Sequence, residues 1–587
     1  MPSKTILRAM LRNNEIARIL REIGEYILMQ EEGFKPRAYE KAAEAIEGFA
    51  EEVAGIYERG GLKAVEDIPG IGKSIGEKVE ELIKTGHMKY YEELKEKMPV
   101  NLSELTVVAG LGPKKIKILY QKLGVKDLKD LEAAAFSGKI SEIRGFGKKS
   151  EENIKKGIEF LKKSGGRFLL GYVLPEVGDI LEKLRAFPGV LRAEVAGSIR
   201  RRKETVGDAD ILVISENPKP VMDFFVKLPE VAHVFAHGET KSAVKLKNGM
   251  DMDLRVVPRE SYGAALAYFT GSKDHNIALR EMAVKKGWKL NEYGLFKGEK
   301  QIAGKTEEEI YDKLGLSFIE PEIRELRGEI EAAASGRLPQ LIEYGDLRGD
   351  LQVQTSWTDG TASIEKMAEA AMDAGLEYIV ITDHTKRLAM TGGLDEKKIK
   401  KQWEEIDEIN LKLKNQKLKF KILKGTECDI LADGSLDLPD EILEKLDVVG
   451  VSVHSLFNLS RAEQTARVKK AISNPNVDIL FHPTGRVIQK RPAYDLDMDD
   501  IIRVAKETGT VLEIDAYPER LDIKDEYIRK CVEAGVKMSI DSDAHSVEHF
   551  KYLRPGVAQA RRGWAERRHI VNAWPVEEML RMLKGGK

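Results

Sequence analysis

Two aspartates one residue apart, Asp208 and Asp210, stand immediately before an apolar run. Side chains alternate along a strand, so both carboxylates would lie on one face and repel each other. Two Mg²⁺ ions about 3.5–4 Å apart would neutralise such a pair, and they could activate a 3′ hydroxyl and neutralise a leaving pyrophosphate. A later strand-like segment supplies a third carboxylate, but spacing alone does not choose between Asp251 and Asp253.

A Gly-Ser step and an arginine pair precede these aspartates. In this segment Ser198 and Arg201 could bind the oxygens of a triphosphate. An isolated Asp-X-Asp is more often a solvated acidic turn. The upstream serine and arginines favour a catalytic site over that alternative.

The histidines form a second chemical cluster, because six of the ten lie in the last third of the chain. Several follow strand-like runs and stand beside an acid or a Pro-Thr-Gly step. Imidazole with carboxylate suits Zn²⁺ or Mn²⁺, and ligands at successive strand ends are typical of the catalytic face of a barrel. The candidate metal ligands are Asp359, His384, Glu427, His454, His482, Asp543 and His545.

Three glycine turns near the N-terminus could bind phosphate without reading any base. Each places an apolar residue between two glycines, directly before a lysine-rich segment with helical character. Backbone N–H groups at such a helix start attract anions, and the lysines add salt-sensitive contacts. A single turn of this kind could be ordinary packing, but three with matching lysines indicate binding to the DNA backbone. The glycine pairs are Gly70 and Gly72, Gly110 and Gly112, and Gly145 and Gly147.

Different secondary structure is predicted around each of these sites. Residues 1–165 show helical spacing, residues 166–260 contain strands, and residues 322–343 are expected to form a linking helix and turn. After residue 346, strands and helices alternate, which indicates βαβ units and a barrel.

Composition excludes several classes of protein. The 587 residues include 95 Lys and Arg against 97 Asp and Glu, a net charge of −2, which at first argues against a nucleic-acid partner. Two cysteines exclude a disulfide scaffold and fit a reducing cytoplasm. No apolar run reaches the roughly 18–20 residues of a membrane span, so we expect a cytoplasmic protein without a membrane partner.

Residues 1–320 resemble an X-family DNA polymerase related to DNA polymerase beta. The blocks that carry the resemblance are Gly-Ser-X-Arg-Arg, Asp-X-Asp, Asp253-Leu254-Arg255, Tyr268-Phe269-Thr270-Gly271-Ser272 and Asn291-Glu292-Tyr293. It implies that Asp253 is the third Mg²⁺ ligand and that Ser198 and Arg201 hold the triphosphate. It also implies a nucleotide-binding group of Arg255, Tyr268, Phe269, Gly271 and Asn276. Lys273 and His275 occupy a loop where the family often carries an acid. The copying fidelity of the family therefore cannot be assigned to this chain.

The same resemblance extends to the glycine turns, which look like helix-hairpin-helix motifs, and to a lysine beside the first of them. Lys78 falls at the family's Schiff-base lysine, which implies lyase activity on a 5′-deoxyribose phosphate or an abasic site. The alternative is an exposed lysine on a basic helix face. Lys35 and Tyr39 match the family's 5′-phosphate pocket.

Residues 346–575 resemble a polymerase and histidinol phosphatase (PHP) domain, as in the bacterial and archaeal PolX arrangement. The family binds three metal ions for 3′–5′ exonuclease and sometimes abasic-site endonuclease activity. Its first strand carries His-X-His, where this chain has Gln352 and Gln354. By the family pattern those residues share one ion with Glu427 and Asp543. An amide oxygen is a weaker Zn²⁺ ligand than imidazole, so we predict fewer than three bound ions and weak exonuclease activity.

Asp515 is a further departure, because family members often carry Asn at that position. The other two sites keep their ligands by the family pattern. One comprises Asp359, His384 and His545, and the other comprises Glu427, His454 and His482.

We therefore expect a multidomain repair polymerase that fills short gaps. Its predicted folds are an α-helical helix-hairpin-helix region, an α+β palm and thumb, and a distorted TIM-like α/β barrel. Its expected partners are gapped or primer-template DNA and dNTPs, and we expect a monomer. The predicted boundaries are 1–95 (N-terminal helical domain), 96–165 (helix-hairpin-helix), 166–258 (catalytic palm), 259–325 (nucleotide-binding thumb), 326–345 (linker) and 346–575 (PHP domain).

Two other functions remain open. The C-terminal hydrolase could be the main activity, with the front part delivering it to DNA, or the chain could be a DNA-end-binding scaffold. The intact aspartates argue against the scaffold, and Gln352 and Gln354 argue against a dominant hydrolase.

Overall fold

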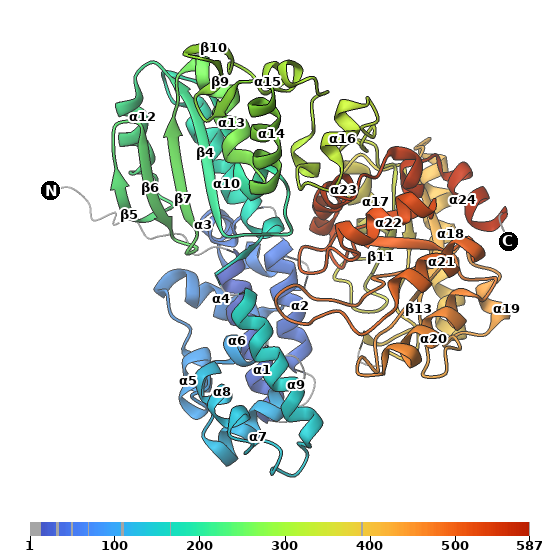
Figure 1. Ribbon diagram of the computed structural model, residues 1–587. Helices are drawn as coiled ribbons and strands as arrows, with labels where there is room; N and C mark the ends of the chain where they lie inside the picture. The colour runs from blue at the N-terminus through green and yellow to red at the C-terminus, as the bar shows by residue number, and fades with distance from the viewer. Residues whose placement is uncertain are drawn as a thin grey trace.

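The computed structural model describes residues 13–585 except 31–34, 49–50, 69, 107, 109–110, 165 and 389–390. In Figure 1 the blue helices of the N-terminal region lie below a green sheet, and the yellow-to-red barrel lies beside both. Across the described part of the chain, we find no helix with the length and apolar character that a bilayer crossing needs.

The N-terminal region is helical, as predicted: its described residues up to 164 form helices and no strand. Apolar residues at helical spacing, such as Ile16, Leu20 and Ile23, are fully buried in a core that the helices share. The helices are α1 (Asn13–Gln30), α2 (Lys35–Gly48), α3 (Val53–Glu66), α4 (Lys73–Thr85), α5 (Lys89–Lys97), α6 (Leu102–Leu105), α7 (Pro113–Leu123), α8 (Leu128–Phe136) and α9 (Lys148–Ser164).

A five-stranded sheet follows, in the order β2-β4-β7-β6-β5, in which β4 and β7 run parallel and the other neighbours are antiparallel. The apolar residues on one face, among them Ala209 and Met252, are buried in its core. The elements are β1 (Phe168–Leu169), α10 (Leu170–Ala186), β2 (Val190–Val195), α11 (Gly197–Arg200), β3 (Thr205–Val206), β4 (Asp208–Ser215), α12 (Pro218–Phe225), β5 (Val231–His237), β6 (Lys241–Leu246) and β7 (Asp251–Val256).

A helical unit with a small antiparallel sheet, β10-β9-β8, comes next. The segment predicted as a linker, 326–345, is packed into this unit: Ile330 and Leu341 join its core, together with Trp564 from the barrel. The elements are η1 (Arg259–Ser261), α13 (Tyr262–Thr270), α14 (Lys273–Lys285), β8 (Lys289–Asn291), β9 (Gly294–Lys297), β10 (Lys300–Ala303), α15 (Glu307–Leu314), η2 (Pro321–Ile323) and α16 (Glu329–Ala334).

The C-terminal part is a nearly closed barrel of parallel strands, β11 to β17 in chain order, which confirms the predicted α/β barrel. A parallel bridge joins Val353, at the end of β11, to Ala544, which follows β17 in the chain. The strands are β11 (Gly349–Val353), β12 (Tyr378–Ile381), β13 (Lys421–Asp429), β14 (Val448–Ser452), β15 (Ile479–Leu480), β16 (Val511–Asp515) and β17 (Met538–Asp541).

Helices surround the barrel, and the side chains of Met579 and Leu583 from the last helix help to fill its apolar interior. The helices are α17 (Ile364–Asp373), α18 (Glu396–Asn415), α19 (Asp440–Leu443), α20 (Arg461–Ile472), α21 (Met498–Thr508), α22 (Asp525–Ala534), η4 (Val547–Tyr552), α23 (Leu553–Arg562), η5 (Arg567–His569), η6 (Val571–Ala573) and α24 (Val576–Gly585).

Candidate active sites

The predicted polymerase aspartates lie on two parallel neighbours, β4 and β7. Asp208 is in register with Asp251, and Asp210 is in register with Asp253. The residues between them, such as Ala209, are buried on the opposite face. All four carboxylates therefore project from one face of the sheet, because side chains alternate along each strand.

Asp210 is the most constrained of these carboxylates. Burial, followed by the negative charges of Asp208 and Asp253, raises its pKa to about 6. Gly197 lies against it with φ of +63°, and a Cβ at that glycine would lie 3.1 Å from Asp210 Oδ2. The backbone approach to the carboxylate therefore requires glycine at this position. Charge crowding of this kind is relieved by a bound cation.

The register distinguishes the two candidates that spacing left open. Asp253 lies opposite Asp210, with Lys241 Nζ at 3.1 Å and Arg255 Nη2 at 3.6 Å. Asp251 lies nearer the edge of this face, where its side chain is 57% exposed and pairs with Lys245 at 2.6 Å. The geometry therefore favours Asp253 as the third carboxylate.

The predicted nucleotide-binding residues lie on β7, α11, α13 and α14, or in the turns that follow them, beside these aspartates. The Arg255 guanidinium stacks 4.6 Å from the Phe269 ring centre, and Phe269 meets Tyr268 edge-on. Asn276 Nδ2 donates a hydrogen bond to Tyr268 O at 2.7 Å. A Cβ at Gly271 would lie 3.2 Å from Arg201 Nη1. The turn between α13 and α14 therefore packs against the Arg201 guanidinium.

Arg201 is already engaged by protein groups, while Ser198 is half-buried in α11. The Arg201 Nε lies 3.1 Å from Glu325 Oε1, and its guanidinium also donates to Thr270 O. A triphosphate would have to compete with Glu325 for this arginine. Sequence patterns did not reveal Glu325, because it is far from Arg201 in the chain and belongs to no motif.

A buried ionic network holds Arg200 of α11, the helix that also carries Ser198. Glu307 lies 2.5 Å from both Arg200 Nη2 and Arg324 Nη1. Burial raises the pKa of Glu307, but Arg324 and Arg200 outweigh it and bring the pKa to about 2. His275 is 1% exposed and lies 2.7 Å from Glu329 Oε1, so it is a packed residue and does not face the nucleotide loop. Lys273 begins α14 on the surface.

Two predicted residues of the lyase region, Tyr39 on α2 and Lys78 on α4, both lie next to Tyr90 on α5. Lys78 Nζ donates to Ser74 O at 2.9 Å and lies 5.2 Å from the ring centre of Tyr90. The Tyr90 ring stacks on that of Tyr39, with the centres 6.4 Å apart. Tyr90 was not among the residues predicted from the sequence. Its ring contacts both the Lys78 ammonium group and the Tyr39 ring. The side chain of Lys35 lies outside the described residues.

The glycine turns share one local structure. Gly72 and Gly112 are the N-caps of α4 and α7, and Gly147 stands just before α9. The apolar residue of each turn is buried, whereas a Cβ at Gly72, Gly112, Gly145 or Gly147 would meet nothing within 4 Å. Gly70 differs, because its Cβ would lie 3.3 Å from Lys41 O, and Gly110 lies outside the described residues.

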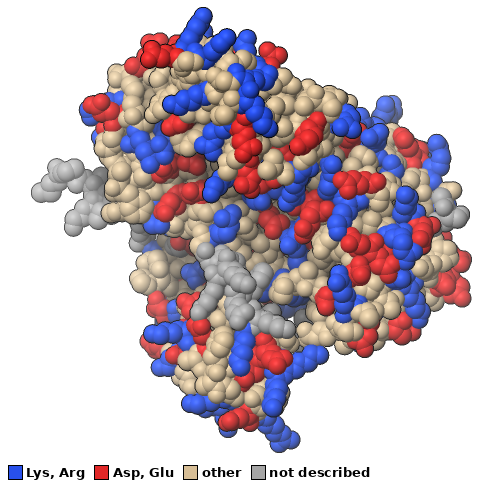
Figure 2. Space-filling view, viewed as in Figure 1, with Lys and Arg blue, Asp and Glu red and all other residues tan. Residues whose placement is uncertain are grey.

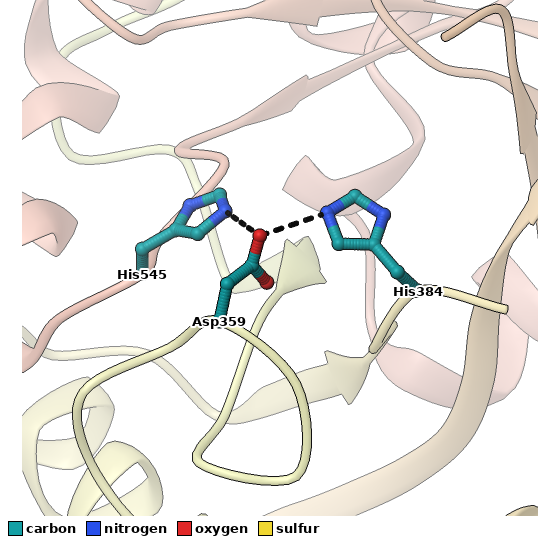
Figure 3. Close-up of side chains that lie close together, drawn as sticks. All are labelled: Asp359, His384 and His545. Carbon is teal, nitrogen blue, oxygen red and sulfur yellow. Dashed lines mark ion pairs between the residues drawn. The ribbon is translucent and has the colours of Figure 1, made fainter. Parts of the chain in front are cut away.

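One predicted metal group at the barrel is assembled around Asp359. Figure 3 shows this carboxylate between two imidazoles from opposite sides, His384 and His545. Asp359 Oδ2 lies 3.4 Å from His384 Nε2 and 3.8 Å from His545 Nε2. One ligand atom from each residue lies within 4.8 Å of the others, which fits a divalent cation.

A second group surrounds Glu427, at the end of β13. Its carboxylate lies 2.8 Å from His482 Nε2, 3.2 Å from His454 Nε2 and 3.3 Å from His384 Nδ1. His384 therefore borders both groups. Burial raises the pKa of Glu427, but His384 and His454 outweigh it and hold the pKa well below its usual range. Asp429, 3.5 Å from His454 Nδ1, was not in the predicted set and orients that ring.

The remaining predicted metal position does not fit a metal ion. Gln352 and Gln354 are fully buried, and Gln354 Nε2 donates to Glu427 Oε2 at 2.8 Å. An amide N–H therefore faces the carboxylate that would share the ion. Asp543 lies 3.7 Å from both Arg520 Nε and His545 Nδ1. Neither polar atom of the Gln352 side chain has a hydrogen-bond partner among the described residues.

Comparisons with known proteins agree with this division of the chain. Residues 11–88 match a helix-hairpin-helix domain, residues 265–325 match the DNA polymerase beta thumb, and residues 350–514 match the PHP domain. DNA polymerase lambda of Rattus norvegicus is 25% identical over 347 residues, covering 53% of this chain and 56% of that protein. The DNA polymerase/3′-5′ exonuclease PolX of Bacillus subtilis (strain 168) is 38% identical over 585 residues, covering 98% of this chain and all of that protein. A helix-hairpin-helix region, a polymerase-beta thumb and a PHP barrel, joined in one chain that matches PolX over 98% of its length, show that this protein belongs to the PolX family of X-family DNA polymerases with a PHP exonuclease domain.

Proposed function

We propose that this chain fills short gaps during DNA repair by template-dependent nucleotidyl transfer. One observation carries the proposal: Asp208, Asp210 and Asp253 share one face of a parallel strand pair, with Gly197 closed against Asp210. Two Mg²⁺ ions bound there would activate the primer 3′ hydroxyl and neutralise the leaving pyrophosphate.

The neighbouring residues have separate tasks in this proposal. Arg255 lies 3.6 Å from Asp253 and orients its carboxylate, while its contact with Phe269 fixes the guanidinium. Arg201 leaves Glu325 to bind the triphosphate, and Ser198 contacts the same phosphates. Tyr268, Gly271 and Asn276 form the wall against the sugar and base. The glycine turns hold the DNA backbone on both sides of the gap.

The deciding experiment measures primer extension on a gapped template with the full-length chain. Asp208→Ala removes one Mg²⁺ ligand and should abolish extension, whereas His482→Ala should leave extension intact. Extension that survives Asp208→Ala would contradict the polymerase site. Loss of extension in both variants would point to a dependence of the polymerase on the barrel.

We also propose that Lys78 is a lyase nucleophile. Its Nζ would attack C1′ of the open sugar, water would leave as the Schiff base forms, and elimination would break the C3′–O bond. The position of Lys78 beside Tyr90 and Tyr39 supports this assignment. Borohydride should trap wild-type protein on abasic DNA and fail to trap Lys78→Ala, with Lys73→Ala as the matched control. Equal trapping of both variants would refute it.

For the barrel we propose a weakened 3′–5′ exonuclease with fewer than three divalent ions. The groups around Asp359 and Glu427 fit Zn²⁺ or Mn²⁺, whereas Gln352 and Gln354 do not complete a third site. Metal analysis of the Mn²⁺-equilibrated chain should give about two ions in this domain. Three tightly bound ions with robust 3′-end degradation would overturn the proposal.

A further inference from the structure

A half-buried arginine lies beside the carboxylates at one side of the barrel centre. Arg520 belongs to the turn after β16, and its Nε lies 3.3 Å from Asp515 Oδ2 and 3.7 Å from Asp543 Oδ2. Its side chain is 22% exposed, while those of Asp515 and Asp543 are 0% and 9% exposed. Both contacts are therefore ion pairs largely removed from water, where a missing partner is costly.

Arg520 is also close enough to act on the histidine side of the centre. Its positive charge contributes to lowering the pKa of His482, after burial, and it interacts with Glu427. The arginine thus faces the centre. Sequence motifs did not single it out, because it stands in a turn and matches no metal-ligand type.

The surrounding strands gather carboxylic acids at this place, and burial raises the pKa of Glu513, Asp515 and Asp541. Glu513 and Asp515 on β16 and Asp541 on β17 are each fully buried, and Asp543 follows β17 directly. Four neighbouring carboxylic acids in a barrel interior cannot all ionise without positive charge nearby. Among the described residues, Arg520 is the basic side chain paired with two of them.

Glu427 and Asp543 are the two carboxylates of the metal position at which Gln352 and Gln354 stand. Each of them contacts another side chain of the protein. Glu427 accepts from the Gln354 amide at 2.8 Å, and Asp543 pairs with Arg520. We propose that Arg520 is a resident cation that holds Asp515 and Asp543 in place of a third divalent ion. This inference rests on the proposed loss of that ion.

Removing the charge of Arg520 should convert this place into a binding position for a divalent cation. Arg520→Met keeps the length and apolar stem but leaves Asp515 without its paired cation and Asp543 with His545 Nδ1 at 3.7 Å. In the full-length chain we expect its melting temperature in EDTA to fall below that of wild type and to be restored by Mn²⁺. Arg520→Lys, which keeps the charge, should behave as wild type.

Metal counting separates this role from simple packing. Mn²⁺-equilibrated Arg520→Met should retain one ion more than wild type, whereas Arg529→Met, which removes an arginine on the barrel surface from Glu533, should retain the same number. An Arg520→Met variant with the wild-type count and the wild-type melting temperature in EDTA would overturn the inference. If wild type itself holds three ions, the proposed loss of the third ion fails instead.

A second background keeps the test decisive if Arg520→Met is too unstable without metal. In Gln352→His/Gln354→His, which supplies two imidazoles, adding Arg520→Met should tighten binding of the third Mn²⁺ by about tenfold or more, because a nearby positive charge is removed. Unchanged or weaker Mn²⁺ affinity would contradict a cationic role for Arg520 at this position.

Discussion

At the scale of single residues, we expect Asp210 to link proton binding to metal binding. Burial and the charges of Asp208 and Asp253 raise its pKa to about 6, so a proton competes with Mg²⁺ below that pH. The Mg²⁺ concentration for half-maximal extension should rise up to about tenfold per pH unit below 6, as expected for one displaced proton. A Mg²⁺ requirement that stays constant between pH 8 and 5 would contradict this.

The sign of the accompanying stability change can be worked out. A carboxyl group whose folded pKa is raised binds its proton more tightly in the folded state, so metal-free protein should lose stability as the pH rises towards 6. Mg²⁺ should therefore raise the melting temperature more at pH 8 than at pH 5. Asp210→Asn should remove most of this difference, and Asp251→Asn, on the exposed side of the same face, should keep it.

Gln352 and Gln354 give the second prediction at this scale. Replacing both by histidine should add a third bound Mn²⁺ and raise 3′-end degradation by at least about tenfold, because imidazole is a stronger ligand than an amide oxygen. Metal analysis and a 3′-labelled strand measure the two effects. An unchanged ion count would show that other residues of the centre exclude the third ion.

At the scale of secondary-structure elements, the start of α15 is held to α11 by charge. Glu307 pairs with Arg200 and Arg324, and its lowered pKa means that its stabilisation is complete above about pH 4.5 and is lost towards pH 2. Glu307→Gln leaves Arg324, which is fully buried, without a counter-charge and should cost about 3 kcal/mol at pH 7. The difference from wild type in calorimetric unfolding should shrink as the pH falls from 5 to 3. A constant difference would show that the loss is steric.

The elements also show what the sequence could predict. Alternation and glycine turns are local patterns, so the helical region, β4, β7 and the barrel strands were predictable. The pairing of β4 with β7 is not local, which is why spacing could not choose between Asp251 and Asp253 and the register could. Glu325, Tyr90 and Arg520 escaped for the same reason: their roles come from contacts that no short motif encodes.

At the scale of the whole molecule, net charge proved a poor guide to function. Figure 2 shows Lys and Arg intermixed with Asp and Glu over this face of the molecule. Other charges, on buried arginines, pair between regions: Arg486 of the barrel lies 2.7 Å from Glu204, and Arg562 lies 3.2 Å from Glu325. The sum of −2 therefore averages the lysine-rich helices that follow the glycine turns with acidic candidate metal sites and interdomain ion pairs.

These interdomain pairs connect the barrel to the proposed nucleotide site through Glu325. Its Oε1 lies 3.2 Å from Arg562 Nη1 and 3.1 Å from Arg201 Nε, so the two arginines share one carboxylate oxygen. In Arg562→Met, Glu325 keeps only Arg201 and Lys203 of its three basic partners. The Glu325–Arg201 ion pair should then be stronger, and a triphosphate must compete with it for Arg201. The KM for dNTP should rise about threefold to tenfold while kcat changes little, because the carboxylates on β4 and β7 are untouched.

Loosening of the interface alone would produce a different result. Arg486→Met breaks a different barrel contact, with Glu204, without touching Glu325, and should leave the KM for dNTP near that of wild type. Steady-state extension on one gapped substrate compares the two variants directly. An equal rise in both would mean that barrel docking acts on the polymerase through domain position, and an unchanged KM in Arg562→Met would show that Glu325 does not restrain Arg201.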